Sequence, residues 1–153
     1  MNQFFFVTVP LLLKLPQNKS TMSLSPDANL DPRVRIRPEV DTAPTTESMA
    51  EQFQNETLRP ILKMQNELLV EMYRHFLVKR KVKFSGMSIP QRSQWIADSV
   101  RKDNRLRGLL LGMVIGQFTE AELVQFIQLE NELRRRITNL ITQRLQSQMK
   151  ALL

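Results

Sequence analysis

The spacing of apolar residues along the chain changes near residue 46. From that point to the C-terminus, apolar residues recur at steps of three and four, which is the spacing of one face of an α-helix. The pattern predicts an all-α, four-helix bundle-like domain over residues 46–153, with a long helix at its C-terminal end. The four helices are expected over about 47–82, 89–103, 105–117 and 119–150.

Polar residues mark where these helices begin. Residues 88–91 (SIPQ) and 119–122 (TEAE) have the spacing of capping boxes, in which a hydroxyl and a Gln or Glu side chain satisfy each other's backbone amides. Asp103 or Asn104 can cap the helix between them. Three of the four helix starts are therefore visible in the local sequence.

The first two predicted helices carry specific expectations. Pro60 lies inside the first, which therefore either kinks there or restarts near Thr57 with the proline in its first turn. The second is expected to bury Trp95, Ile96 and Val100 in the core.

The third predicted helix, over 105–117, is apolar nearly all round and is expected to be central. Gly108, Gly112 and Gly116 are each four residues apart on it, although a helical glycine costs roughly 1 kcal/mol relative to alanine. This spacing predicts close packing against another helix, within the chain or across a dimer. The apolar stretch is too short for a membrane-spanning dimerisation motif.

The fourth predicted helix, over 119–150, carries an apolar stripe from Leu123 to Met149. At 1.5 Å per residue it would be a rod of about 45 Å, longer than a bundle of the other helices needs. The overhanging part could pair with a second copy or with a partner helix. The alternative is an ordinary bundle helix whose frayed end carries Gln143, Gln146 and Gln148 into solvent.

The part of the chain before residue 46 holds six of the eight prolines. Because proline fixes φ and removes an amide donor, residues 1–45 are expected to form a disordered or extended arm. Residues 33–37 alternate arginine with apolar residues, which in an extended chain puts three guanidinium groups on one side; a solubilising tail explains so short a pattern as well. Residues 1–21 contain an apolar run too short to span a membrane, and are either a weak targeting segment or precede a native start at Met22.

The composition excludes most familiar enzyme classes. With no cysteine and only four glycines, the chain lacks material for a disulfide framework, a thiolate zinc site, a P-loop or a dinucleotide-binding loop. The single histidine, His75, follows Glu67 and Glu71 at helical spacing, and these three are remote candidates for a metal site. They also belong to a column of alternating charge, typical of a solvent-facing helix side. No catalytic residue, cofactor or small-molecule substrate is expected.

The net charge of +7 lies entirely beyond residue 50, because residues 1–50 hold equal numbers of basic and acidic residues. If the basic clusters converge in space, they form a surface that attracts phosphates; if they scatter, they serve solubility and the helix dipoles. One tryptophan and one tyrosine give no evident platform for base stacking. The basic candidates are Lys79, Arg80, Lys81, Lys83, Arg101, Lys102, Arg105, Arg107, Arg134, Arg135 and Arg136.

Three stretches are similar to segments of a group of short uncharacterised bacterial helical proteins, some of which carry a glyoxalase label. They are TLRPILK at 57–63, LGMVIGQFT at 111–119 and ITQRLQSQ at 141–148. The resemblance covers about residues 50–150 and implies a bacterial helical domain. Glyoxalase I enzymes hold their metal with His and Glu ligands in a β-rich site. This chain has one histidine and no predicted strand, so no catalytic residue is carried over.

These observations favour a small, non-catalytic helical interaction or regulatory module. We expect it to be cytoplasmic and to bind a protein partner or a second copy of itself as a homodimer. The alternative is a basic protein associated with nucleic acid or with the ribosome. A metal-binding or glyoxalase-like enzyme is the remote third alternative.

Overall fold

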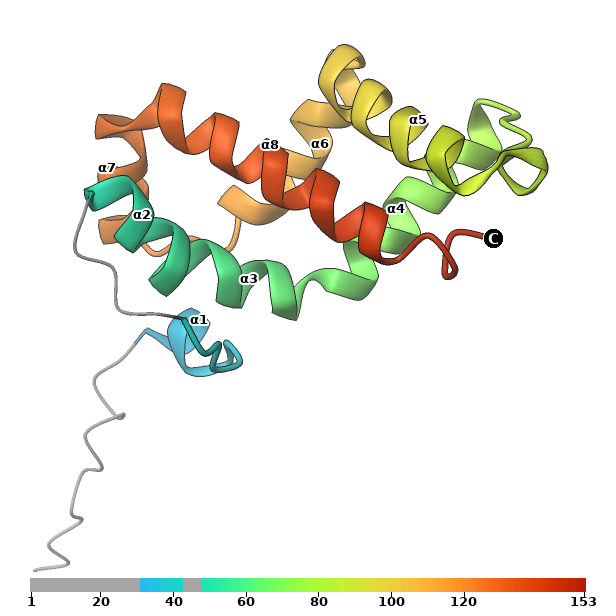
Figure 1. Cartoon of the computed structure of the whole chain (residues 1–153). Helices are drawn as coiled ribbons and strands as arrows, with labels where there is room; N and C mark the ends of the chain where they lie inside the picture. The colour runs from blue at the N-terminus through green and yellow to red at the C-terminus, as the bar shows by residue number, and fades with distance from the viewer. Residues whose placement is uncertain (1–30, 43–47) are drawn as a thin grey trace, which may run out of the picture.

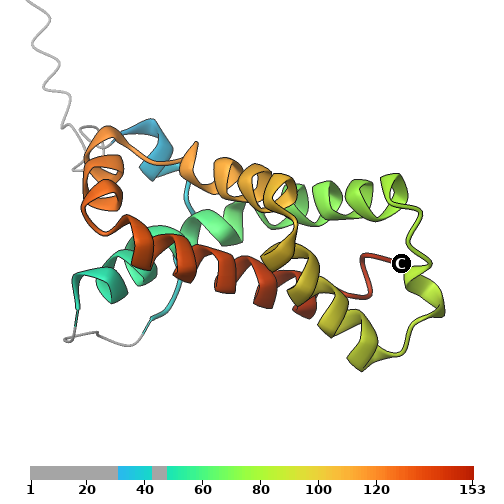
Figure 2. The ribbon, with the colours of Figure 1, turned by 90° about the horizontal axis from the view of Figure 1, so that it is seen from above.

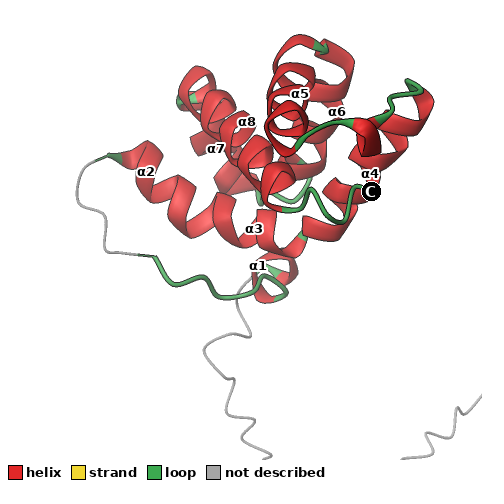
Figure 3. Ribbon diagram, turned by 45° about the vertical axis from the view of Figure 1, so that its right-hand side comes forward, coloured by secondary structure: helices red, strands yellow, loops and turns green. Residues whose placement is uncertain are grey.

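The computed structural model describes residues 31–42 and 48–153, and every regular element in these two ranges is helical (Figure 3). The predicted all-α fold is therefore confirmed, and within these ranges no helix is long and apolar enough to cross a membrane. Residues 1–30 and 43–45 of the predicted arm lie outside the described residues.

From Met49 onward the helices follow one another with short connections (Figure 1). A π-helical turn spans Gln54–Leu58 and a 3₁₀ turn spans Phe84–Gly86. The α-helices are α1 (Pro32–Arg35), α2 (Met49–Phe53), α3 (Arg59–Met64), α4 (Asn66–Lys79), α5 (Ile89–Lys102), α6 (Asn104–Ile115), α7 (Glu120–Gln128) and α8 (Glu130–Ser147).

The first predicted helix, over 47–82, is distorted just before Pro60 and divided at Gln65. Proline has no amide hydrogen to donate to the carbonyl of Glu56, and its ring crowds that carbonyl. The chain widens into the π-helical turn just before this point, and α3 begins with Pro60 in its first turn. Gln65, at φ −87° and ψ 4°, then separates α3 from α4. Pro60 therefore lies in the first turn of α3, but the backbone stays helical from Phe53 through Arg59, so the helix does not restart near Thr57 with a new cap.

The fourth predicted helix, over 119–150, is divided at Leu129, whose φ of −119° and ψ of 25° are not helical. Figure 2 shows α7 turned across the end of the molecule, away from the axis of α8. The 18 residues of α8 make it about 27 Å long. The prediction of an overhanging 45 Å rod is therefore wrong, although α8 is the long C-terminal helix of the fold.

The centre of the fold is α8, which packs against α4, α5, α6 and the π-helical turn. Its apolar residues Leu133, Ile137, Ile141 and Leu145 are almost fully buried. The helix predicted to be central corresponds to α6, and this prediction is wrong, because α6 buries one face and leaves Leu109 47% exposed on the other.

The break at Leu129 also exposes part of the predicted apolar stripe. On α7 only Phe126 is buried, and it packs on the ring of Phe118 at 5.7 Å. Leu123 and Ile127 are 40% and 62% exposed. Because α7 turns away from α8, its residues do not continue the buried face that α8 presents.

Residues 31–42 do not form the expected extended arm but dock on the junction between α6 and α7. Arg33 donates a hydrogen bond to the carbonyl of Phe118 at 2.6 Å, and Arg37 donates to that of Gln117 at 2.7 Å. Arg37 also pairs with both carboxylate oxygens of Glu122. Carbonyls at the C-terminal end of a helix lack intrahelical partners, and cations are favoured there.

Candidate nucleic-acid interface

The sharp turn between α5 and α6 is made by one residue, Asp103. Its backbone is extended, and its Oδ1 accepts hydrogen bonds from the amides of Arg105 and Leu106, both at 3.0 Å. The cap lets α6 begin as soon as α5 ends. The predicted Asp103 cap is thus confirmed, and it brings four basic residues to one bend, residues 101–107, called here the α5–α6 corner.

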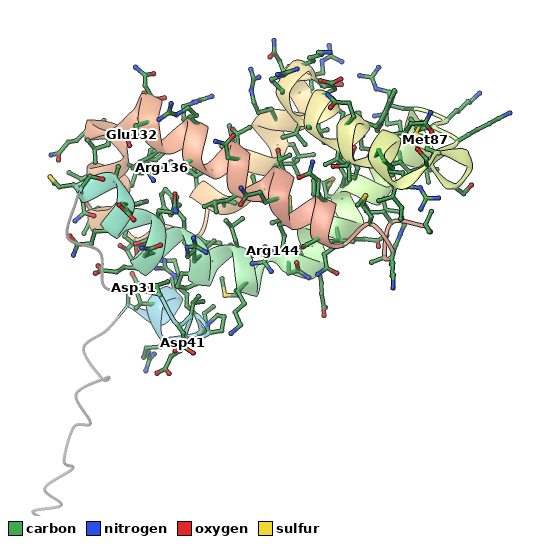
Figure 4. The ribbon with its side chains drawn as sticks, in the orientation of Figure 1. Asp31, Asp41, Met87, Glu132, Arg136 and Arg144 are labelled. Carbon is green, nitrogen blue, oxygen red and sulfur yellow. The ribbon has the colours of Figure 1, made fainter. Side chains whose placement is uncertain are left out.

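Basic residues from two separate segments of the sequence meet on one side of this corner. Arg101 and Arg107 from the corner face Arg134 and Arg135 from α8 across a depression, the arginine groove. Along the upper edge in the view of Figure 4, nitrogen-tipped side chains project from α8 and from the corner. No carboxylate is among the described residues that line the groove, which are Arg101, Arg107, Leu111, Asn131, Arg134, Arg135, Thr138 and Asn139.

The arginines of this groove are only lightly paired. Arg101 contacts Asp98 at 2.8 Å, and Arg134 contacts Glu130 at 3.2 Å. Arg107 donates to the Asn104 side chain at 2.6 Å, while Arg135 has no ion pair among the described residues. Exposed ion pairs contribute about 0–1 kcal/mol, so an incoming phosphate can displace them at little cost.

A second depression, the tryptophan groove, lies on the other side of the corner between α4 and α5. Arg80 forms part of its wall, with its guanidinium 5.6 Å from the centre of the Phe76 ring and 2.6 Å from Asp103. The groove is lined by Phe76, Arg80, Val82, Trp95, Asp98, Ser99, Lys102 and Asp103.

A third depression adjoins the tryptophan groove, since Arg80 and Asp103 line both. Lys79 and Arg105 stand on its rim, between α4 and α6. The corner is therefore basic on both sides, with four arginines towards α8 and a mixture of lysines and arginines towards α4.

The two carboxylates that line these depressions stay ionised. A hydrogen bond from Gln94, helped by Lys102 and Arg101, holds the pKa of Asp98 below its ordinary value. The amide of Leu106, together with Arg80, does the same for the pKa of Asp103. Both are partly neutralised by the basic groups that they hold, so they position cations at the corner.

Three of the predicted basic residues lie apart from the grooves at the corner. Arg136 faces the opposite way, where it pairs with Glu132 at 2.8 Å and donates to Gln54 at 3.0 Å (Figure 4). Lys81 follows α4 in a left-handed conformation with φ 53°. Lys83 lines a shallow depression on the far side of Trp95.

The remote metal candidates Glu67, Glu71 and His75 lie on the exposed side of α4. Glu71 pairs with Arg74, and His75 lines the depression beside Lys79. In the part of the chain that the structure describes, no group of three His, Cys, Asp or Glu side chains is placed to hold a metal ion.

The glycine strip of α6 does not pack against another helix among the described residues. A Cβ added at Gly108 or Gly112 meets nothing within 4 Å among the described residues, and one at Gly116 meets only the carbonyl of Gly112, at 3.0 Å. The prediction of close helix packing inside the chain is therefore wrong. Packing across a dimer stays a prediction.

The sequence reasoning missed Trp95, which it expected in the core. Ile96 and Val100 are buried as predicted, but Trp95 is 38% exposed in the tryptophan groove. The helical spacing of the neighbouring residues did indicate that Trp95 is exposed. Ser99 and Lys102 follow Trp95 by four and seven residues, so all three lie on the polar face of α5.

Comparison of the chain with protein-family models, with curated proteins and with solved structures gives no match in any of the three. The candidate interface therefore stands on its own geometry.

Proposed function

We propose that the protein is a small, non-catalytic binding module that holds the phosphate backbone of a nucleic acid at the α5–α6 corner. The observation that carries this proposal is the arginine groove, where Arg101, Arg107, Arg134 and Arg135 meet from two helices with no carboxylate in the lining described. Arginine offers planar, paired donors that match phosphate oxygens. Phosphate contacts of this kind supply most of the affinity of sequence-independent nucleic-acid binding.

The charge of the molecule supports the same partner. The net charge of +7 comes from the helical part of the chain, and basic residues flank the corner on both sides. A positive surface raises the rate of encounter with a polyanion. Thr138, Asn131 and Asn139 add neutral polar groups to the groove, and such groups often contact phosphate and sugar oxygens.

The test is a salt series on binding of a fluorescein-labelled oligonucleotide of about 20 residues, single-stranded and duplex, followed by anisotropy. Each phosphate neutralised contributes about −0.7 (single strand) or −0.9 (duplex) to the slope of log K against log salt. Four arginine contacts therefore predict a slope near −3, and the double variant Arg134→Gln, Arg135→Gln is expected to reduce its magnitude by about 1.5.

The matched control removes two positive charges away from the grooves, by Lys81→Asn and Lys150→Gln. Neither residue lines the arginine or tryptophan groove, and asparagine tolerates the left-handed backbone at position 81. The control is expected to bind as the wild type does, apart from a small general loss of attraction. The proposal would be overturned if the two double variants lost equal amounts of affinity for the oligonucleotide, or if the affinity did not depend on the salt concentration.

Other expectations from the sequence stay predictions. Self-association has one observation in its favour, the uncovered glycine face of α6. The described residues do not test the cytoplasmic location or the resemblance to short bacterial helical proteins. The same holds for the metal-binding or glyoxalase-like alternative.

A further inference from the structure

Trp95 has an unusual position for the only tryptophan of the chain. It lies near the middle of α5, 38% exposed, and lines a depression on each of its two sides. Large aromatic side chains usually bury most of their surface, so an accessible indole in a concave site is an informative exception.

The surroundings of Trp95 combine aromatic surface with two basic residues, Arg80 and Lys102, and two carboxylates, Asp98 and Asp103, that pair with basic groups of the corner. Phe76 and Val82 give the tryptophan groove an apolar floor, and Arg80 and Lys102 stand at its edge. Asp98, which lies one turn along α5, is paired with Arg101 at 2.8 Å and with Lys102 at 3.3 Å. A flat, uncharged ring flanked by phosphates fits such a site, because the ring can stack on the indole while the phosphates meet the cations.

The tryptophan groove and the arginine groove flank the same last turn of α5. Arg101 lines one and Lys102, the next residue, lines the other. Along the helix axis Trp95 is about 9 Å from Arg101. Six residues of helix also turn by about 600°, so the two side chains leave α5 on different sides. A strand that reaches both grooves therefore crosses the last turn of α5 at the α5–α6 corner.

A base-paired duplex does not offer a free base face to Trp95. Its bases are stacked on each other and paired, so their faces are not free to meet a side chain. An unpaired base has an open π-face, and stacking on an aromatic side chain tolerates any base sequence.

We infer that the nucleic acid is bound as a single strand, with an unpaired base stacked on Trp95 and the neighbouring phosphates held by Arg101, Arg134 and Arg135. This inference rests on the proposed function and adds the class of nucleic acid that the site takes. Stacking fixes a base without reading its edge, so the site prefers single strands over duplexes of any sequence.

The single tryptophan makes the test direct, because all the indole fluorescence of the chain comes from Trp95. The probes are an oligothymidylate of about 12 residues and a blunt duplex of the same length, which are sequence-tolerant substrates of such stacking sites. The oligothymidylate is expected to quench the fluorescence to saturation and to bind more tightly than the duplex.

Variants separate stacking from charge. Trp95→Ala is expected to weaken single-strand binding about 5- to 100-fold with an unchanged salt slope, whereas Trp95→Phe keeps most of the affinity. Val78→Ala, at an exposed apolar position of α4, is the control and leaves binding unchanged. Circular dichroism melting verifies that each variant is folded, and quenching of the wild type needs no variant at all.

The outcomes distinguish this inference from the proposed function. Salt-dependent binding that leaves the fluorescence unquenched and is insensitive to Trp95→Ala overturns the inference and leaves the proposed function standing. Tighter binding of the duplex than of the oligothymidylate likewise overturns the inference and leaves the proposed function standing. Absence of binding to either probe at low salt overturns both.

Discussion

At the scale of single residues, buried polar pairs fix how the helices meet. The hydroxyl of Tyr73 lies 2.7 Å from that of Ser99 and joins α4 to α5 beneath the tryptophan groove. Burial raises the pKa of Tyr73 to about 12, so it stays protonated at every physiological pH. Arg37 and Glu122, whose side chains are 5% and 15% exposed, hold residues 31–42 against the start of α7.

The pair of Arg37 and Glu122 predicts a pH dependence of stability. Burial raises the pKa of Glu122, but hydrogen bonds from Arg37 and the Thr119 amide outweigh it and hold the pKa below its ordinary value. Because the folded-state pKa is the lower one, the ionised carboxylate stabilises the fold at neutral pH. This contribution is lost as the pH falls through the folded-state pKa.

The substitution Glu122→Gln is therefore expected to lower the free energy of unfolding at pH 7 by about 3 kcal/mol, since it leaves Arg37 buried without its counter-charge. It should also flatten the fall in stability below about pH 5. Urea denaturation over a pH series measures both effects. Glu120→Gln, at an exposed position in the same turn of α7, is the control, and an identical pH profile in the two variants would contradict the assignment.

At the scale of elements, the helix starts were predictable and some helix breaks were not. The capping boxes at Ser88 and Thr119 form as their sequences predict, because the partners are three residues apart and depend on local geometry alone. The break at Leu129 has no proline or glycine, and the apolar spacing continues through it. It depends on how α7 packs on residues distant in sequence, which local pattern does not encode.

The candidate site was predictable to the same extent, because local sequence does not encode how distant elements pack. The basic residues were found from composition, but their partition into grooves depends on the angle that Asp103 sets between α5 and α6. Trp95 was placed in the core by residue type, although its helical position favoured the polar face.

The glycines of α6 give a prediction at this scale. Gly108→Ala and Gly112→Ala are each expected to raise the free energy of unfolding by up to about 1 kcal/mol, because alanine favours the helix and the added Cβ meets open space. Gly116→Ala is the matched control and should bring no gain, since its Cβ lies 3.0 Å from the carbonyl of Gly112. Thermal or urea unfolding measures the three variants. A lower free energy of unfolding in Gly112→Ala would contradict the assignment of open space beside this face of α6.

At the scale of the whole molecule, the fold separates a basic corner from an uncovered glycine face on the same helix. The N-terminal end of α6 belongs to the corner, while Gly108, Leu109 and Gly112 follow along its exposed side. The proposed nucleic-acid interface and the predicted dimer interface therefore lie on neighbouring parts of one element, and the two proposals can be tested independently.

The predicted homodimer is measured by sedimentation velocity at several protein concentrations. The dimer fraction is expected to rise with concentration, and Gly112→Leu should reduce it, because the larger side chain prevents close approach of a second helix. Ala121→Leu, a similar enlargement at an exposed position of α7, is the control. A single species with the mass of one chain at every concentration would contradict self-association.

The junctions at Asp103 and Leu129 each consist of a single residue, so the chain has no slack at either point. One extra residue at position 103 would separate the start of α6 from the carboxylate that caps it and change the direction in which α6 leaves α5, which would carry Arg107 away from Arg101. At Asp103 the length of the connection therefore matters as well as the capping side chain. Insertions and deletions at these two junctions are the changes in chain length that this fold tolerates least.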